Sequence, residues 1–258
     1  MSELIKPMLP DERHAAITKT AHDLHLTAFS QYMKYLNRNA SFEENLYTLL
    51  MEQSQIAFQK RVKRRVQAAG FPYTKTINMF KLSKDIYPNL DINEVQELTN
   101  CQFIKEKIDV CAFSPSGHGK THLALAIGYE AIKMGFTVKF RRASDLINEM
   151  AEAKSEKKLS DYMRMMTRCS LLVIDEIGYL DYDAAASSHL FQIIGARYET
   201  GSTFYTSNQM FSEWGKFIGN DNLANAIVSR IAHHAILLDM NGPMTWRLEN
   251  AKSRRTNT

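Results

Sequence analysis

The stretch that decides the fold is DVCAFSPSGHGKTHLALAIGYEAI, residues 109–132, in which a short apolar run leads through a glycine-containing loop into a helix-length apolar segment. The loop, SPSGHGKT (114–121), follows the pattern G-x-x-x-x-G-K-[ST] with serine in place of the first glycine. Between a strand and a helix, such a loop turns its backbone N–H groups toward a phosphate at the helix N-terminus. The stretch therefore predicts a phosphate-binding loop in an α/β domain.

Four more apolar runs extend this pattern toward the C-terminus, separated by spacers of helical length. They are TVKF (137–140), LLVI (171–174), TFYT (203–206) and AILL (235–238). Together with DVCAF (109–113) they predict a five-stranded parallel sheet flanked by helices.

The residue types of the loop suit a nucleotide with a magnesium ion. Lys120 can reach the β- and γ-phosphates, and the Thr121 hydroxyl can ligate Mg²⁺. A side chain at Ser114 is expected to strain the start of the loop, because a Cβ atom resists positive φ. No catalytic role is expected for either histidine of this stretch. The expected ATP-binding residues are Ser114, Pro115, Ser116, Gly117, His118, Gly119, Lys120, Thr121 and His122.

A pair of carboxylates, Asp175-Glu176, directly follows the run LLVI. Ligands of open parallel sheets bind at the carboxyl edge of the strands, where this pair should lie. We expect Asp175 to join Thr121 in the Mg²⁺ shell and Glu176 to orient or deprotonate the attacking water. The alternative, a solvated strand end, is disfavoured by the upstream phosphate loop, and the adjacent glutamate indicates hydrolysis rather than passive binding.

Positive charge is a local feature of this chain. Its 258 residues carry a net charge of +4, yet the segment 53–84 has eight basic residues and no acidic one, which leaves −4 on the rest. Five of the eight form the cluster KRVKRR, where non-specific contacts with DNA phosphates are expected: Lys60, Arg61, Lys63, Arg64 and Arg65. A second basic group, Lys154, Lys157 and Lys158, lies between the runs TVKF and LLVI, and its role as a candidate for DNA binding is implied by the family resemblance given below. For both groups the alternative is an ordinary solvated helix face. For the second group, the sequence favours neither DNA binding nor a solvated face.

The N-terminal third has a different character. Residues 24–69 follow a helical apolar pattern, Ser41 and Glu44 have capping-box spacing, and Gly70-Phe71-Pro72 ends the helix. We expect a helical, basic domain for DNA binding and oligomerisation over 1–75, a linker over 76–104 and an ATPase domain over 105–258. The lack of an apolar leader or an 18-residue apolar run predicts a cytoplasmic protein with no membrane partner.

These motifs resemble those of AAA+ ATPases of the initiator and helicase-loader branch, and most closely the IstB-type transposition helpers of insertion sequences. The resemblance extends from about Leu24 to Arg247. It is carried in the ATPase region by GKTHLALAIG, LLVIDEIGYL, LFQIIGARYETGSTFYTSN and AIVSRIAHHAILL, and in the N-terminal region by LHLTAFSQYMKYL, ASFEENLYTLLMEQ and RRVQAAGFPYTKTI.

The resemblance implies further roles. Asn208 would be the sensor-1 residue that contacts the γ-phosphate or water, with Thr206 and Ser207 as alternatives. Arg230 would be the arginine finger that acts on a neighbouring subunit's nucleotide, and Arg197 is a weaker candidate. The catalytic set is then Lys120, Glu176, Asn208, Arg230 and Arg247, the last as a sensor-2-like arginine.

Two further expectations concern the C-terminal part. The short stretch after the fifth run predicts that the four-helix lid of many AAA+ proteins is nearly absent. His233-His234 has no partner at a metal-ligand spacing, so a helix-end or core role is expected.

Three functions compete. The first is an ATP- and Mg²⁺-dependent regulator that assembles as a ring or helical homo-oligomer on duplex DNA, without sequence specificity, and stimulates a cognate transposase. The second is a DnaC-like replicative helicase loader, and the third a scaffold whose assembly ATP controls without hydrolysis. The IstB-like N-terminal region favours the first over the second, and Glu176 with Arg230 argues against the third.

Overall fold

The structure is a computed structural model that describes residues 9–243. The chain divides into two compact units, Met1–Arg64 and Arg65–Thr258, which are described separately. Within the described part, no helix is both long enough and apolar enough to cross a membrane.

The first unit is helical. Its elements are α1 (Pro10–Asp23), α2 (Thr27–Ser30), the 3-10 turn η1 (Tyr32–Lys34) and α3 (Phe42–Ala69), whose last turn belongs to the second unit. The expected capping box starts α3, since the Glu44 N–H donates to Ser41 Oγ (3.2 Å) and the Ser41 N–H to Glu44 Oε2 (2.7 Å). Gly70, at φ +80°, follows the end of α3. The expected helical run from Leu24 is interrupted before Ser41, where the Asn45 amide donates to the carbonyls of Asn37 and Ala40 and stabilises a loop.

The second unit is built on a five-stranded parallel sheet with the order β2-β3-β4-β1-β5. The strands are β1 (Asp109–Phe113), β2 (Val138–Arg142), β3 (Leu171–Ile177), β4 (Ser202–Ser207) and β5 (Ala235–Asp239). All five predicted strands are confirmed. The main difference is that β3 continues through the carboxylate pair to Ile177.

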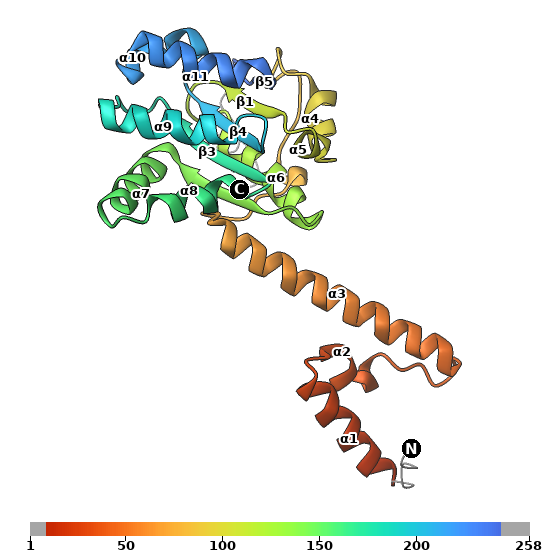
Figure 1. The fold of residues 1–258 in the computed structure, drawn as a ribbon. Coiled ribbons are helices and arrows are strands. Elements are labelled where there is room, and N and C mark those ends of the chain that lie inside the picture. The colour runs from red at the N-terminus through yellow and green to blue at the C-terminus, as the bar shows by residue number, and fades with distance from the viewer. Residues whose placement is uncertain (1–8, 244–258) are drawn as a thin grey trace, which may run out of the picture. The chain divides into compact units, whose positions relative to one another are not determined.

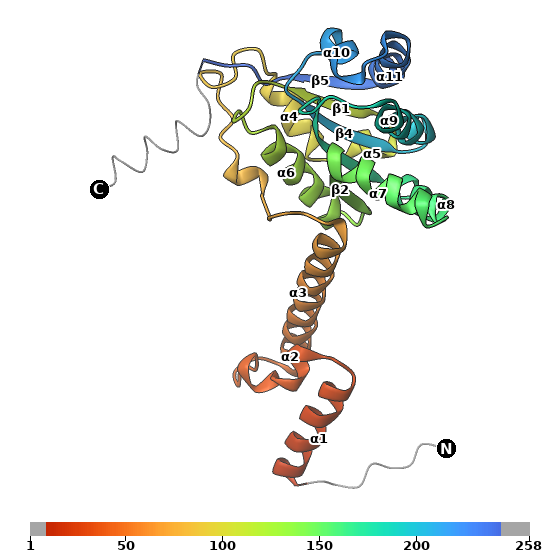
Figure 2. The same ribbon diagram turned by 90° about the vertical axis from the view of Figure 1, so that its left-hand side faces the viewer.

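Helices cover both faces of the sheet (Figures 1 and 2). On one face lies α6 (Lys120–Lys133), and the other face carries α7 (Ala143–Ser155), α8 (Leu159–Thr167), α9 (Ala184–Arg197), α10 (Trp214–Ile218) and α11 (Asp221–His233), with the short turn η3 (Phe211–Glu213). The core under the second set includes Leu172 and Ile174 of β3, Leu190 of α9 and Ile227 of α11. The predicted α/β sandwich is therefore confirmed.

The segment before the sheet packs against the phosphate-loop region. It contains η2 (Ile77–Met79), α4 (Ile92–Leu98) and α5 (Gln102–Lys105), and it buries Phe80 and Tyr87. The Tyr87 hydroxyl donates to the carbonyl of His118 inside the loop (2.7 Å). The stretch expected to be a linker thus holds helices and buried side chains, while the proposed domain limits remain a prediction.

Candidate nucleotide site

The loop 114–119 leaves the carboxyl end of β1 and enters α6 at Lys120. Gly117 and Gly119 have φ of +91° and +88°, a backbone conformation that favours glycine. At Gly119 a Cβ atom would also lie only 2.8 Å from the Phe80 ring. Ser114 is not among the residues with positive φ, so the expected strain there is wrong; its N–H instead donates to the carbonyl of Ser207 on β4 (3.3 Å).

Lys120 is buried beside this loop. Its ammonium donates to the carbonyls of Ser114 (2.5 Å) and Pro115 (3.0 Å). Burial disfavours the charged form and lowers the pKa of Lys120 to about 8, although the carboxylates of Asp175 and Glu176 act in the opposite direction.

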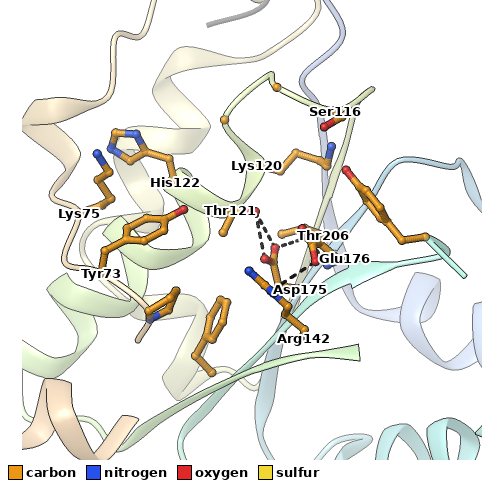
Figure 3. Close-up of a pocket in the computed structure, with 15 residues that line it drawn as sticks. Tyr73, Lys75, Ser116, Lys120, Thr121, His122, Arg142, Asp175, Glu176 and Thr206 are labelled. Carbon is orange, nitrogen blue, oxygen red and sulfur yellow. Dashed lines mark hydrogen bonds and ion pairs between the residues drawn. The ribbon is translucent and has the colours of Figure 1, made fainter. Parts of the chain in front are cut away.

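Two threonine hydroxyls hold the Asp175 carboxylate, which is only 1% exposed. Thr121 Oγ1 donates to Asp175 Oδ1 (2.9 Å), and Thr206 Oγ1 donates to the same oxygen (2.6 Å) (Figure 3). Burial raises the pKa of Asp175, while the two hydroxyl donors and the cations Arg142 and Lys120 oppose that shift. Strand β3 thus brings the expected metal carboxylate to the first turn of α6.

Glu176 has an unusual backbone. Its φ is +63°, and the pairing of β3 with β4 shifts register between Ile174 and Ile177, which marks a bulge. A non-glycine residue in this conformation costs about 1–3 kcal/mol and persists only where its surroundings enforce it. Here the Glu176 N–H donates to Thr206 Oγ1 (2.9 Å), and the Glu176 carboxylate lies 3.4 Å from Arg142 Nε. The bulge turns this side chain toward the site while Asp175 stays buried.

These groups line a cavity of about 250 Å³. Its lining includes eight of the residues expected from the sequence: Ser116, Gly117, Gly119, Lys120, Thr121, His122, Asp175 and Glu176. Three other expected loop residues, Ser114, Pro115 and His118, do not line it. The two ring nitrogens of His118 contact the carbonyls of Pro115 (3.2 Å) and Gly242 (3.3 Å).

Several lining residues were not expected: Pro72, Tyr73, Lys75, Phe140, Arg142 and Tyr179 (Figure 3 labels Tyr73, Lys75 and Arg142). Arg142 ends β2, so its place at the carboxyl edge of the sheet was a signal that sequence reasoning could have used. Tyr73 and Lys75 precede the sheet by many residues, and no motif connects them with the loop.

Of the three candidates for the sensor-1 position, only Thr206 lines the cavity. Asn208 follows the end of β4, is exposed and does not line the cavity. The Ser207 hydroxyl donates to the carbonyl of Ile177 (2.9 Å). Thr206, expected only as an alternative, lines the cavity and contacts both residues of the carboxylate pair.

The three arginines with expected catalytic roles also lie in different environments. Arg197 is 2% exposed, and its guanidinium donates to the carbonyls of Met166, Cys169 and Ser202, which gives it a structural place in the core. Arg230 is half-buried on α11, where its guanidinium lies 4.4 Å from the centre of the Phe191 ring, and it does not line the cavity. Arg247 lies outside the described residues.

The basic candidates for DNA binding are mostly exposed. Lys60, Arg61, Lys63 and Arg64 are exposed on α3, and Arg65 is half-buried. Among the described residues none of these five forms an ion pair, although Lys60 donates to Thr27 Oγ1 (2.9 Å). The second group is exposed around the turn between α7 and α8, and there Lys158 pairs with Glu156 (2.7 Å).

The sheet order, the phosphate loop and the carboxylate pair at the strand ends define a P-loop nucleotide-binding ATPase. Residues 18–254 match the family model described as IstB-like ATP binding protein, and the chain belongs to that family.

Curated relatives agree with this family assignment, and a solved structure shares the fold. The chain is 35% identical to the ATP-binding protein of insertion sequence IS5376 from Geobacillus stearothermophilus, over 92% of this chain and 95% of that relative. It is 32% identical to the ATP-binding protein of insertion sequence IS21 from Pseudomonas aeruginosa, over 83% of this chain and 80% of that relative. The crystal structure of the DnaC helicase loader shares the fold, with a TM-score of 0.53 at 18% identity over 68% of this chain and 98% of that one. The protein is thus a P-loop ATPase of the IstB-like family, whose curated relatives are ATP-binding proteins of insertion sequences.

Proposed function

We propose that this ATPase regulates DNA transposition: it assembles on duplex DNA without reading sequence, in an ATP-dependent manner, and recruits and stimulates the transposase of its insertion sequence. The observation that carries the proposal is the row of basic residues on α3, none ion-paired among the described residues, in a chain whose second unit gathers Lys120, Asp175 and Glu176 around one cavity.

The donor set fits magnesium together with ATP. The Thr121 hydroxyl and the Asp175 carboxylate are hard oxygen ligands 2.9 Å apart, and such ligands suit Mg²⁺. Bound there, the ion would neutralise charge on the β- and γ-phosphates. Lys120 would bind the same phosphates through its ammonium, and the loop would bind them through its N–H groups.

Hydrolysis is assigned to Glu176, which would orient the attacking water and accept its proton. Arg142 holds the Glu176 carboxylate at the cavity wall, and Thr206 holds the Glu176 backbone. Thr206 is the better candidate than Asn208 for the sensor-1 role, because its hydroxyl lies within the cavity and contacts Asp175.

Arg230 is proposed to act on the nucleotide of a neighbouring subunit. It does not line the cavity of its own chain, whereas the competing Arg197 is enclosed in the core and cannot reach another molecule. Arginine fingers contribute about 10³–10⁵ in rate, so assembly of a ring or helix would complete the active site.

DNA binding is assigned to KRVKRR, with Lys154, Lys157 and Lys158 as a second contact. Like charges repel along a helix unless an anion meets them, and phosphates would supply that anion. Exchanging the five basic residues of KRVKRR for glutamine keeps good helix formers in place and removes the charge.

The test is the salt dependence of binding to duplex DNA. Each phosphate contact contributes about −0.9 to the slope of log affinity against log salt, so the variant with all five substitutions should have a slope shallower by about 4.5. A control variant that exchanges the exposed Lys105 and Lys107 for glutamine should bind like the wild type. An unchanged slope in the KRVKRR variant would refute the assignment, and a strong preference for single strands over duplex would favour the helicase-loader function.

A further inference from the structure

We propose that Glu199, His233 and His234 form a surface site for a divalent transition-metal ion of the zinc class. The site is separate from the nucleotide cavity and does not depend on the proposed function. It lies at the amino-terminal edge of the sheet, because Glu199 precedes β4 and the two histidines precede β5, whereas the nucleotide cavity lies at the carboxyl edge.

The three side chains come together in space from two segments of the chain. One ligand atom from each lies within 4.8 Å of the other two, and all three residues are exposed. The imidazole rings of His233 and His234 are 4.2 Å apart between centroids. Tetrahedral zinc with ligand distances near 2.0–2.1 Å needs its ligand atoms about 3.4 Å apart. Small rotations of exposed side chains can close that difference.

A contact with Tyr198 orients the ring of His233, one of the three proposed ligands. The Tyr198 hydroxyl lies 2.9 Å from His233 Nδ1. Histidines that bind metals usually donate their other ring N–H to an oxygen, which fixes the tautomer and the direction of the ring. With Nδ1–H donated to Tyr198, the lone pair of His233 Nε2 is available for the metal.

The position also suits a cation. His233 is the last residue of α11 and His234 follows it, so the ion would lie at the negative end of the helix dipole. A positive charge that would repel the ion is that of Arg230, one turn earlier on the same helix. This charge acts on Tyr198, where it favours a lower pKa of the hydroxyl.

The donor set selects the class of ion. Two imidazoles with one carboxylate suit Zn²⁺ and its neighbours Co²⁺, Ni²⁺ and Cu²⁺, whereas Mg²⁺ prefers oxygen ligands alone. The three cysteines, Cys101, Cys111 and Cys169, are buried and do not offer a competing thiolate site at the surface.

The test is a Zn²⁺ titration of the full-length protein without an affinity tag, after removal of metals with a chelator, in competition with a chromophoric chelator. The wild type should bind one Zn²⁺ per chain, also with excess Mg²⁺ present. His233→Ala and His234→Ala should each weaken binding by at least about tenfold, and Tyr198→Phe by about tenfold through loss of the orienting hydroxyl.

His14→Ala is the matched control, because His14 is also exposed and its Nδ1 also lies near a tyrosine hydroxyl, that of Tyr32 (3.0 Å). It should bind Zn²⁺ like the wild type, and every variant should keep its affinity for ATP, which shows that the fold is intact. Equal Zn²⁺ affinity in the wild type and the His233→Ala/His234→Ala double variant would overturn the proposal. Loss of binding in His14→Ala would overturn it as well.

Discussion

Thr206→Val removes one hydroxyl at the centre of the site while the shape of the side chain is kept. In the wild type this hydroxyl donates to Asp175 Oδ1 (2.6 Å) and accepts from the Glu176 N–H (2.9 Å). A hydrogen bond to a charged group contributes about 1.5–3 kcal/mol, so the free energy of unfolding should fall by about that amount. The pKa of Asp175, which burial already raises, should rise further because a donor that opposes the shift is lost.

The larger effect is expected in catalysis. Without the Thr206 contact, the strained Glu176 backbone at φ +63° loses one of the bonds that hold it. General-base catalysis contributes about 10²–10⁴ in rate, and a displaced base keeps part of that, so kcat should fall by about 10- to 100-fold. The KM for ATP should change little, since the phosphate loop is untouched.

The control is Thr203→Val on the same strand. Thr203 is also fully buried, and its hydroxyl accepts from Arg197 Nε (3.0 Å) in the core. Chemical denaturation and steady-state ATP hydrolysis should show a loss of stability in both variants and a loss of kcat in Thr206→Val alone. Equal kcat in the two variants would refute the role of Thr206 as the residue that positions Glu176.

Three other predictions concern the charged groups. Burial lowers the pKa of Lys120 to about 8, and its ammonium is charged only below that pH. ATP affinity should therefore fall as the pH rises through about 8, by up to about tenfold per pH unit. Titration calorimetry of Lys120→Arg across this range should find no such dependence. In denaturation experiments, Arg197→Ala should lower the free energy of unfolding by about 3 kcal/mol or more, because buried carbonyls lose their donor. Arg230→Ala should lower it by about 1 kcal/mol or less. The reverse order would contradict the placement of these arginines. Mixtures of Arg230→Ala and Lys120→Ala protomers should regain ATPase activity that neither has alone, and mixtures that co-assemble without recovery would count against a finger acting between subunits.

The sheet and the two halves of the nucleotide site could be predicted because their signals are local. Each strand is a continuous apolar run, and the loop 114–121 and the pair Asp175-Glu176 stand at the ends of two such runs. Helix α1 falls within the expected helical domain, but no apolar pattern marks it, because its sequence is mostly polar and only Ala21 is buried. The capping box of α3 was found because its residues are only three positions apart.

The remaining features depend on contacts between distant segments. The bulge that turns Glu176 into the cavity arises from the pairing of β3 with β4, and no residue type in LLVIDEI signals it. Thr206 contacts Asp175 only once these strands are neighbours in the sheet. Likewise, Glu199 joins His233 and His234 because the segments before β4 and β5 come together, which a search for ligand spacing along the chain does not detect.

We propose that ATP-dependent assembly on DNA serves transposition, and strand transfer by the cognate transposase measures this role most directly. Wild-type protein with ATP should stimulate strand transfer into duplex DNA. The variant with the five basic residues of KRVKRR exchanged for glutamine should not, and Glu176→Gln should bind ATP and accumulate on DNA without hydrolysing it. Absence of stimulation by the wild type, or stimulation that persists undiminished without ATP and without the KRVKRR charges, would contradict a role of this protein in transposition.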